Sequence, residues 1–91
     1  MQLDVAMRSA LSLARRGIGK CYPNPSVGCI ILDRYSNLIG VGRTSNKGRP
    51  HAEEAALDSL VGSPKGGTAI ISLEPCAHSN SKLSCVEKII N

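Results

Sequence analysis

The chain has 91 residues, which is the size of one small domain. It contains no Trp or Phe, so its core must be built from Ile, Leu, Val and Ala. The formal net charge is +4, and the basic residues are spread along the chain without a long cationic run. This spread favours a small anionic ligand such as a phosphate monoester over a nucleic-acid groove, although an ordinary positive surface would give the same charge.

The sequence also indicates a cellular compartment for the protein. No apolar run approaches the length of a membrane span. Asp4 and Arg8 interrupt the N-terminal segment where a signal peptide would be apolar. We therefore expect a cytoplasmic protein that binds no membrane. Thiols stay reduced in that compartment, so the four cysteines should be ligands or core residues instead of two disulfides.

The first predicted element is an amphipathic helix over residues 3–16, where small apolar residues recur at helical spacing before two glycines. The stretch CYPNPS (21–26) follows. The prolines on either side of Asn24 exclude regular structure there and hold that residue extended. Asn24 is thus placed on a stiff loop, where it could be an ordinary turn residue or a ligand contact.

A hairpin and a second helix come next. Residues 27–32 form a continuous apolar run, which predicts a buried strand that includes Cys29, and residues 38–43 return as a second strand. Pro50 then opens a helix over residues 51–60. Its first turn carries two glutamates, as the helix dipole favours. Cys21 and Cys29 are interpreted as structural residues.

The last part predicts a third strand over residues 68–73 and a final helix. The helix is indicated by a capping-box pattern, Ser84-x-x-Glu87, and includes Val86, Ile89 and Ile90. The order helix, hairpin, helix, strand, helix predicts an α/β fold with a sheet covered on both faces. The second and third strands are joined by a helix, so they should be parallel if they are adjacent.

Four residues suggest a metal-dependent reaction. An imidazole at His51 and thiolates at Cys76 and Cys85 would make a three-ligand zinc site with a fourth position open for water. Glu53, two residues after His51, could take a proton from that water and hand it to a leaving nitrogen. The alternatives are that the two cysteines form a disulfide or are buried thiols, and that Glu53 only complements the helix dipole.

These residues match a known pattern in part. His51-Ala52-Glu53 and Pro75-Cys76 fit the H-x-E and P-C-x-x-C signature of zinc-dependent base deaminases, but the second cysteine stands nine positions after the first instead of three. With the stretches YPNPSVGCIIL, HAEEAAL and SLEPCAH, this longer spacing resembles the deaminase domain of the bifunctional riboflavin-biosynthesis deaminase/reductase. The resemblance extends over nearly the whole chain.

The resemblance implies a three-layer α-β-α sandwich of the cytidine-deaminase type, with residues 1–91 forming one domain that lacks the family's C-terminal strands and helices and its reductase domain. It implies hydrolytic deamination of a diaminopyrimidinone ribosylamine 5′-phosphate. It assigns one Zn²⁺ per chain, and the residues it implicates are the metal ligands His51, Cys76 and Cys85, the proton-transfer residue Glu53, and the substrate contacts Asn24 and His78.

The chain departs from the family at two positions that would contact substrate. Arg43-Thr44 stands where the family usually has an aromatic-histidine pair, and Ser81 stands where it usually has a basic residue. Two alternatives to the deaminase hypothesis are therefore open. One is a truncated, catalytically silent zinc-binding remnant, and the other is a nucleoside or transfer-RNA deaminase. The long cysteine spacing and the lack of stacking aromatics argue against the second.

The final prediction concerns assembly. If a helix follows the third strand, the outer edge of that apolar strand has no hydrogen-bonding partner, and such an edge promotes association. We therefore expect a homo-oligomer whose folding zinc binding supports.

Overall fold

The computed structural model of the protein describes residues 1–17, 26–45, 51–73 and 84–90. Its secondary structure elements are, in chain order, α1 (Leu3–Arg16), β1 (Val27–Leu32), β2 (Leu38–Arg43), α2 (Ala52–Asp58), β3 (Thr68–Leu73) and β4 (Ser84–Ile89). The first helix and the first three strands have the predicted bounds. The second helix is shorter than predicted at its C-terminal end. No helix among these described elements is long and apolar enough to cross a membrane.

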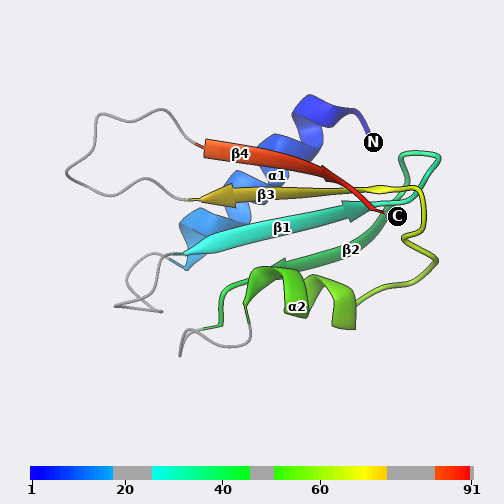
Figure 1. The fold of residues 1–91 in the computed structure, drawn as a ribbon. Coiled ribbons are helices and arrows are strands. Elements are labelled where there is room, and N and C mark those ends of the chain that lie inside the picture. Colours follow the sequence, from blue (N-terminus) through cyan, green and yellow to red (C-terminus); the bar gives the residue numbers. More distant parts are fainter. Residues whose placement is uncertain (18–25, 46–50, 74–83, 91) are drawn as a thin grey trace.

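The four described strands form one sheet in the order β2-β1-β3-β4 (Figure 1). Each neighbouring pair is antiparallel. Strands β2 and β3 run in the same direction, but β1 lies between them in the sheet. The helix α2, which connects β2 to β3 in the chain, therefore does not join adjacent strands. The hairpin partner β2 and the later strand β3 therefore take opposite sides of β1.

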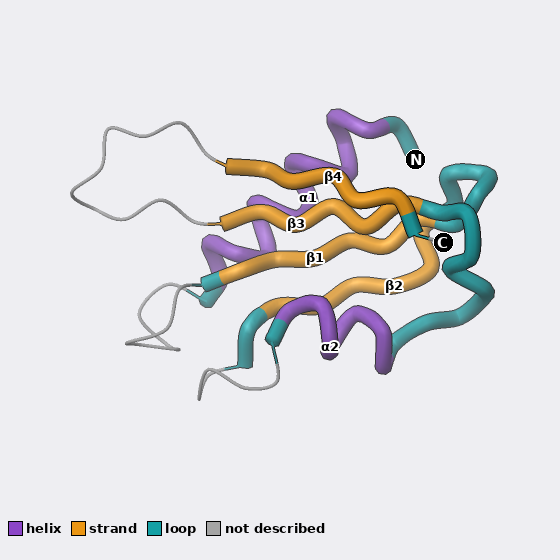
Figure 2. The backbone as a smooth tube through the Cα atoms, viewed as in Figure 1, coloured by secondary structure: helices purple, strands orange, loops and turns teal. Residues whose placement is uncertain are grey.

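The two helices cover opposite faces of this sheet, which confirms the predicted three-layer α-β-α arrangement (Figure 2). Side chains of β1 alternate between the faces. Ile30 and Leu32 pack with the buried alanines of α1, whereas Cys29 and Ile31 pack with those of α2. Because aromatic residues are absent from both clusters, the core consists of small and branched aliphatic side chains, as the composition predicts.

Glycines allow both helices to lie close to the sheet. A Cβ atom at Gly28 of β1 would overlap the carbonyl oxygen of Ala10 in α1. A Cβ atom at Gly42 of β2 would lie 2.5 Å from the carbonyl oxygen of Ala52 in α2. Both approaches are backbone to backbone, so neither can be relieved by moving a flexible side chain.

The last described element corrects the sequence prediction. Residues 84–89 form strand β4, which pairs antiparallel with β3 from Ser84↔Leu73 to Ile89↔Thr68, and not the predicted helix. The capping-box pattern is a local signal, whereas the β-branched residues Val86 and Ile89 suit a strand equally well. Pairing along β3 satisfies backbone groups that a helix would leave open, and this tertiary gain decides the conformation.

The position of β4 also removes the reason given above for association. The outer edge of β3 is paired along its whole length, so the expectation of an open β3 edge is wrong. At the opposite side of the sheet, the edge of β2 is partly covered by the segment after α2. The Ser59 hydroxyl accepts a hydrogen bond from the Val41 amide at 3.1 Å, and the Val61 amide donates to the Ile39 carbonyl at 2.9 Å.

Candidate functional site

The N-terminus of α2 positions two of the predicted site residues. His51 is the N-cap residue of this helix, with an extended backbone (φ −69°, ψ 160°), and its carbonyl accepts the first helical hydrogen bond from the Ala55 amide at 3.0 Å. The imidazole makes no capping hydrogen bond to the helix, and the residue is exposed. His51 therefore presents its ring to the surface instead of using it to hold the helix end.

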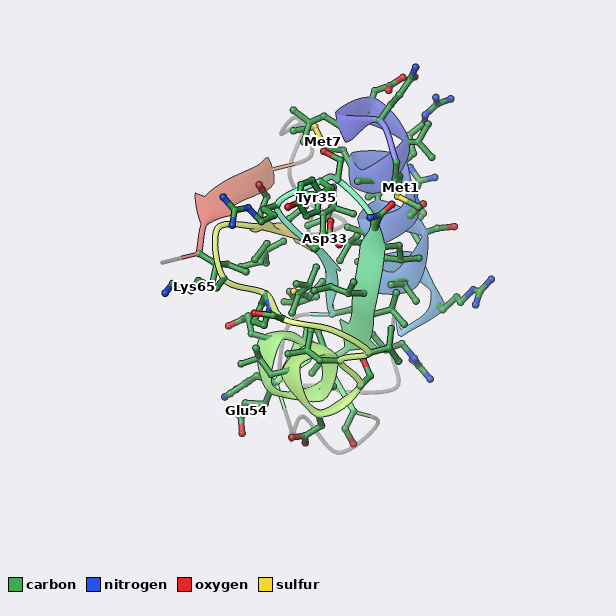
Figure 3. The ribbon with its side chains drawn as sticks, turned by 90° about the vertical axis from the view of Figure 1, so that its right-hand side faces the viewer. Met1, Met7, Asp33, Tyr35, Glu54 and Lys65 are labelled. Carbon is green, nitrogen blue, oxygen red and sulfur yellow. The ribbon has the colours of Figure 1, made fainter. Side chains whose placement is uncertain are left out.

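Glu53 lies in the first turn of the same helix, two residues after His51, and is exposed. Its charge acts on Cys29, whose buried thiol lies in the cluster beneath α2. Burial, and secondarily the Glu53 carboxylate, raise the pKa of Cys29 to about 11. Cys29 is therefore a neutral thiol at physiological pH, which confirms its predicted place in the core. The neighbouring Glu54 points away from the sheet into solvent (Figure 3).

In the chain, the remaining predicted residues lie next to strand residues at one end of the sheet. The Cα partners Val27, Leu73 and Ser84 lie in one row of the ladder. The N-terminus of α2 is at this same end, because Ala52 lies against Gly42 and the Thr44 amide donates to the Val27 carbonyl at 2.9 Å. Asn24 precedes this row in the chain, Cys76 follows Leu73, and Cys85 follows Ser84.

The structure brings some predicted residues together and separates others. His51 and Glu53 share one helix turn. The backbone of Cys85 lies in β4 opposite Ser72, at the same end of the sheet but two strands away from β1, or about 10 Å at the usual strand spacing. The side chain of Cys85 is outside the described part of the structure, and so are Asn24, Cys76, His78 and Ser81.

Two observations bear on the fit of zinc to these residues. One imidazole and two thiols form a donor set that zinc favours, and His51 supplies an imidazole that no helix amide engages. Among the described side chains, however, no three His, Cys, Asp or Glu residues gather into a group that could hold a metal ion. The donor chemistry thus fits zinc, and the described residues supply one ligand of the predicted three.

Thr44 has a role that sequence reasoning missed. Its side chain is buried, and its hydroxyl accepts a hydrogen bond from the Val27 amide at 3.0 Å. Together with the bond between the Thr44 amide and Val27 carbonyl, this closes the ladder between β1 and β2 at the end where α2 begins. The only sequence signal was a β-branched residue directly after a strand. Thr44 therefore extends the pairing of β1 with β2. The riboflavin-biosynthesis deaminases that the chain resembles usually have a histidine at this position.

Comparison with known proteins identifies the family. The model of the cytidine and deoxycytidylate deaminase zinc-binding region matches residues 1–91, the whole chain. The chain is 40% identical over 90 residues to the riboflavin biosynthesis protein RibD of Escherichia coli, a match that covers 99% of this chain and 24% of that protein. No solved structure matches the chain.

Two further relatives have related names. RibD of Corynebacterium ammoniagenes is 35% identical and is covered over 26% of its length by 97% of this chain. The chloroplastic riboflavin biosynthesis protein PYRD of Zea mays is 41% identical and is covered over 21% of its length by 93% of this chain. The chain thus spans about a quarter of the length of these relatives. By its whole-length match, it belongs to the family of the cytidine and deoxycytidylate deaminase zinc-binding region.

Proposed function

We propose that residues 1–91 act as a single zinc-dependent deaminase domain in riboflavin biosynthesis. The substrate is a diaminopyrimidinone ribosylamine 5′-phosphate, a small phosphorylated pyrimidine, and nucleic acid is not a substrate. The observation that carries this proposal is that His51 caps α2 and Glu53 lies in its first turn, in a chain 40% identical to RibD over 99% of its length.

Each site residue has a role in the proposed reaction. His51, Cys76 and Cys85 would hold one zinc ion per chain, and when bound this ion supplies Lewis acidity that makes water a better nucleophile near neutral pH. The Glu53 carboxylate accepts a proton from the attacking water and delivers it to the departing nitrogen. Water thus replaces the amino group on the ring carbon, and ammonia leaves. Asn24 and His78 are proposed to contact the substrate.

A catalytically silent zinc-binding domain is the second candidate. It is favoured by the buried Thr44, whose hydroxyl is engaged by the Val27 amide and cannot contact a substrate in this arrangement. The two candidates differ in whether the chain releases ammonia, and they agree on zinc binding. Deamination of a nucleoside or of transfer RNA has no comparable support among the described residues.

We further propose that the protein is cytoplasmic. Cys29 is a free, buried thiol, which suits the reducing cytoplasm. We also propose that the protein forms a homo-oligomer. Sedimentation of the purified protein at micromolar concentration tests this, and a monomer under those conditions contradicts it.

The decisive variant is Glu53→Gln. It should retain about one zinc per chain and lose about 10²-fold or more of the ammonia release, because the amide cannot accept the proton. Ammonia release is measured with the phosphorylated pyrimidine as substrate, and zinc is measured by atomic emission. Glu54→Gln is the matched control, since Glu54 lies in the same helix turn and points to solvent.

The outcomes separate the candidates. Wild-type protein that binds zinc and releases no ammonia supports the silent domain. Equal turnover by wild type and Glu53→Gln would show that the carboxylate does not transfer the proton. Protein that folds and binds no zinc contradicts both candidates.

A further inference from the structure

A hollow of about 480 Å³ lies at the opposite end of the sheet from the N-terminus of α2. The described residues that line it come from the turn between β1 and β2 and from the loop before β3, and they are Asp33, Arg34, Tyr35, Ser63, Lys65 and Gly66. Figure 3 views the molecule from this end, with Asp33 and Tyr35 near the centre. The proposed deaminase chemistry uses none of these residues.

The Asp33 carboxylate makes its hydrogen bonds within the turn between β1 and β2. Its Oδ1 atom accepts hydrogen bonds from the amides of Tyr35 at 2.9 Å and Asn37 at 2.8 Å. Its Oδ2 atom accepts a bond from the Asn37 side chain at 3.1 Å. The hydrogen bonds from Asn37 and Tyr35 hold the pKa of this carboxyl below its usual value, so it stays ionised. Both oxygens are thus occupied by donors of the turn, which argues against a cation site.

The unused polar groups around the hollow are mainly donors. The Arg34 guanidinium lies over the Tyr35 ring, 5.6 Å from its centroid. Lys65 extends outward from the other wall (Figure 3). Among the described residues, the only ion pair joins Arg8 and Asp4. Neither Arg34 nor Lys65 therefore pairs with a described carboxylate. Stacking on Tyr35 leaves the guanidinium edge available for an acceptor.

The wall that carries Lys65 is held in place by backbone hydrogen bonds. The Gly66 amide donates to the Ile90 carbonyl at 2.9 Å, and the Gly67 amide donates to the Pro64 carbonyl at 2.8 Å. Gly66 has φ +76°, a left-handed conformation that glycine adopts without strain. A Cβ atom at Gly66 would lie 3.5 Å from the Arg34 Cβ, so the loop and the turn are within van der Waals range. Two cationic residues are therefore placed on facing, defined walls.

We infer that this hollow binds a small phosphate-bearing anion through Arg34, Lys65 and the Ser63 hydroxyl. Arg34 and Lys65 line the hollow together with a single carboxylate, Asp33, whose acceptors are already engaged, so the net charge around the hollow favours an anion. The planar guanidinium can donate two parallel hydrogen bonds to phosphate oxygens, and the lysine adds a mobile charge. A volume of about 480 Å³ is within the usual range for small-molecule sites. The inference does not depend on the proposed deaminase activity.

The test is a titration of the ¹⁵N-labelled chain with inorganic phosphate at constant ionic strength, with chloride as the balancing anion. Phosphate should shift the amide signals of Arg34, Lys65 and Gly66. The double variant Arg34→Gln/Lys65→Gln should bind phosphate at least tenfold more weakly. Arg8→Gln is the matched control, because Arg8 is an exposed arginine on α1, away from the hollow, and it should leave the affinity unchanged.

The positions of the shifted amide signals show where phosphate binds, in addition to showing that it binds. Shifts confined to the amides of His51 and Glu53 would place phosphate at the candidate metal centre and overturn the inference. Equal affinity of the wild type and the double variant would also overturn it, as would equal shifts with chloride and with phosphate. The circular dichroism spectrum of each variant shows whether it is folded, and Ser63→Ala, which removes one exposed hydroxyl, should weaken binding by a smaller factor than the double variant.

Discussion

The two helices cover opposite faces of the same sheet and differ in what they contribute. α1 has 14 residues, buries Ala6, Ala10 and Ala14, and lies over β1 and β3. α2 has seven residues, buries Ala52 and Ala56, and lies over β2 and β1. Both pack closely against a strand glycine. Only α2 carries candidate site residues, His51 and Glu53, which lie at its N-terminus. Both faces of the sheet therefore contribute to stability, and the α2 face also carries the proposed chemistry.

This difference has a physical consequence for the site. A seven-residue helix is too short to be stable by itself in water, so α2 depends on its contacts with the sheet. Those contacts are made by small residues, Ala52 and Ala56 against Gly40 and Gly42. The orientation of His51 and Glu53 is thus set by how closely α2 can approach β2. The three predictions below separate the two faces, in order of decreasing expected effect.

The largest effect is expected from valine at the two packing glycines. Gly28→Val and Gly42→Val should each lower the free energy of unfolding by about 3 kcal/mol, because the new side chain meets helix backbone. Gly28→Val acts on the α1 face and should leave the zinc affinity of the folded protein unchanged. Gly42→Val acts on the α2 face and should weaken zinc binding as well. Denaturant unfolding and competition with a zinc-binding dye measure the two quantities.

Gly62→Ala is the control for this pair, because a Cβ atom there would lie 3.5 Å from Ile39, an ordinary contact. It should change neither quantity. If Gly28→Val and Gly42→Val weaken zinc binding equally, the two faces are not separable, and the assignment of chemistry to the α2 face alone is wrong.

The second prediction uses the ionisable group buried on the α2 face. The pKa of Cys29 is raised from 9.0 to about 11 in the folded protein. Its contribution to stability is therefore complete below pH 9 and is lost as the pH rises towards 11. The loss should amount to about 2 kcal/mol. It is measured as the change in unfolding free energy between neutral pH and alkaline pH.

Cys29→Ala is the comparison for this measurement. The variant should be less stable at neutral pH, because it leaves a small cavity, and its stability should fall less steeply between pH 9 and 11. The other three cysteines are the same in both proteins, so the difference between the two slopes belongs to Cys29. Parallel pH profiles would contradict the raised pKa.

The smallest effect is expected at the hydroxyl groups that fasten the C-terminal ends of the helices. The Ser59 hydroxyl bonds to the Val41 amide next to the end of α2, and the Ser26 hydroxyl donates to the Ala14 carbonyl near the end of α1. Ser59→Ala and Ser26→Ala should each cost about 1 kcal/mol of stability. Only Ser59→Ala should also increase self-association, because it opens the edge of β2. Sedimentation of both variants at equal concentration decides this.

Much of the fold could be predicted because its signals are local. The run at residues 27–32 is apolar, follows Pro25-Ser26 and precedes Asp33, and it forms β1 with the same ends. Residues 84–89 carry a helix signal and β-branched residues together, and only the presence of β3 alongside decides between them. The sequence alone does not show that β3 lies beside these residues, so the prediction of a helix was wrong.

The candidate site could be predicted to a different extent. The start of α2 directly after His51 follows from Pro50 and the acidic first turn, so the placement of His51 and Glu53 at the N-terminus of one helix was predictable from the sequence. The part played by Thr44 was not, because it depends on Val27, which lies 17 residues earlier and meets Thr44 only once β1 and β2 pair. The convergence of Cys76 and Cys85 on His51 stays a prediction.

Strand β1 has a place in the sheet that affects how the protein exchanges with solvent. It has a paired strand on each side, β2 and β3, and a helix on each face. No local opening can expose its amides without separating several elements at once. In heavy water, the amides of β1 should therefore exchange their hydrogens last, at a rate that reports global unfolding. The amides at the start of the seven-residue α2 should exchange much earlier, and the difference would measure how independently the candidate site moves while the sheet stays folded.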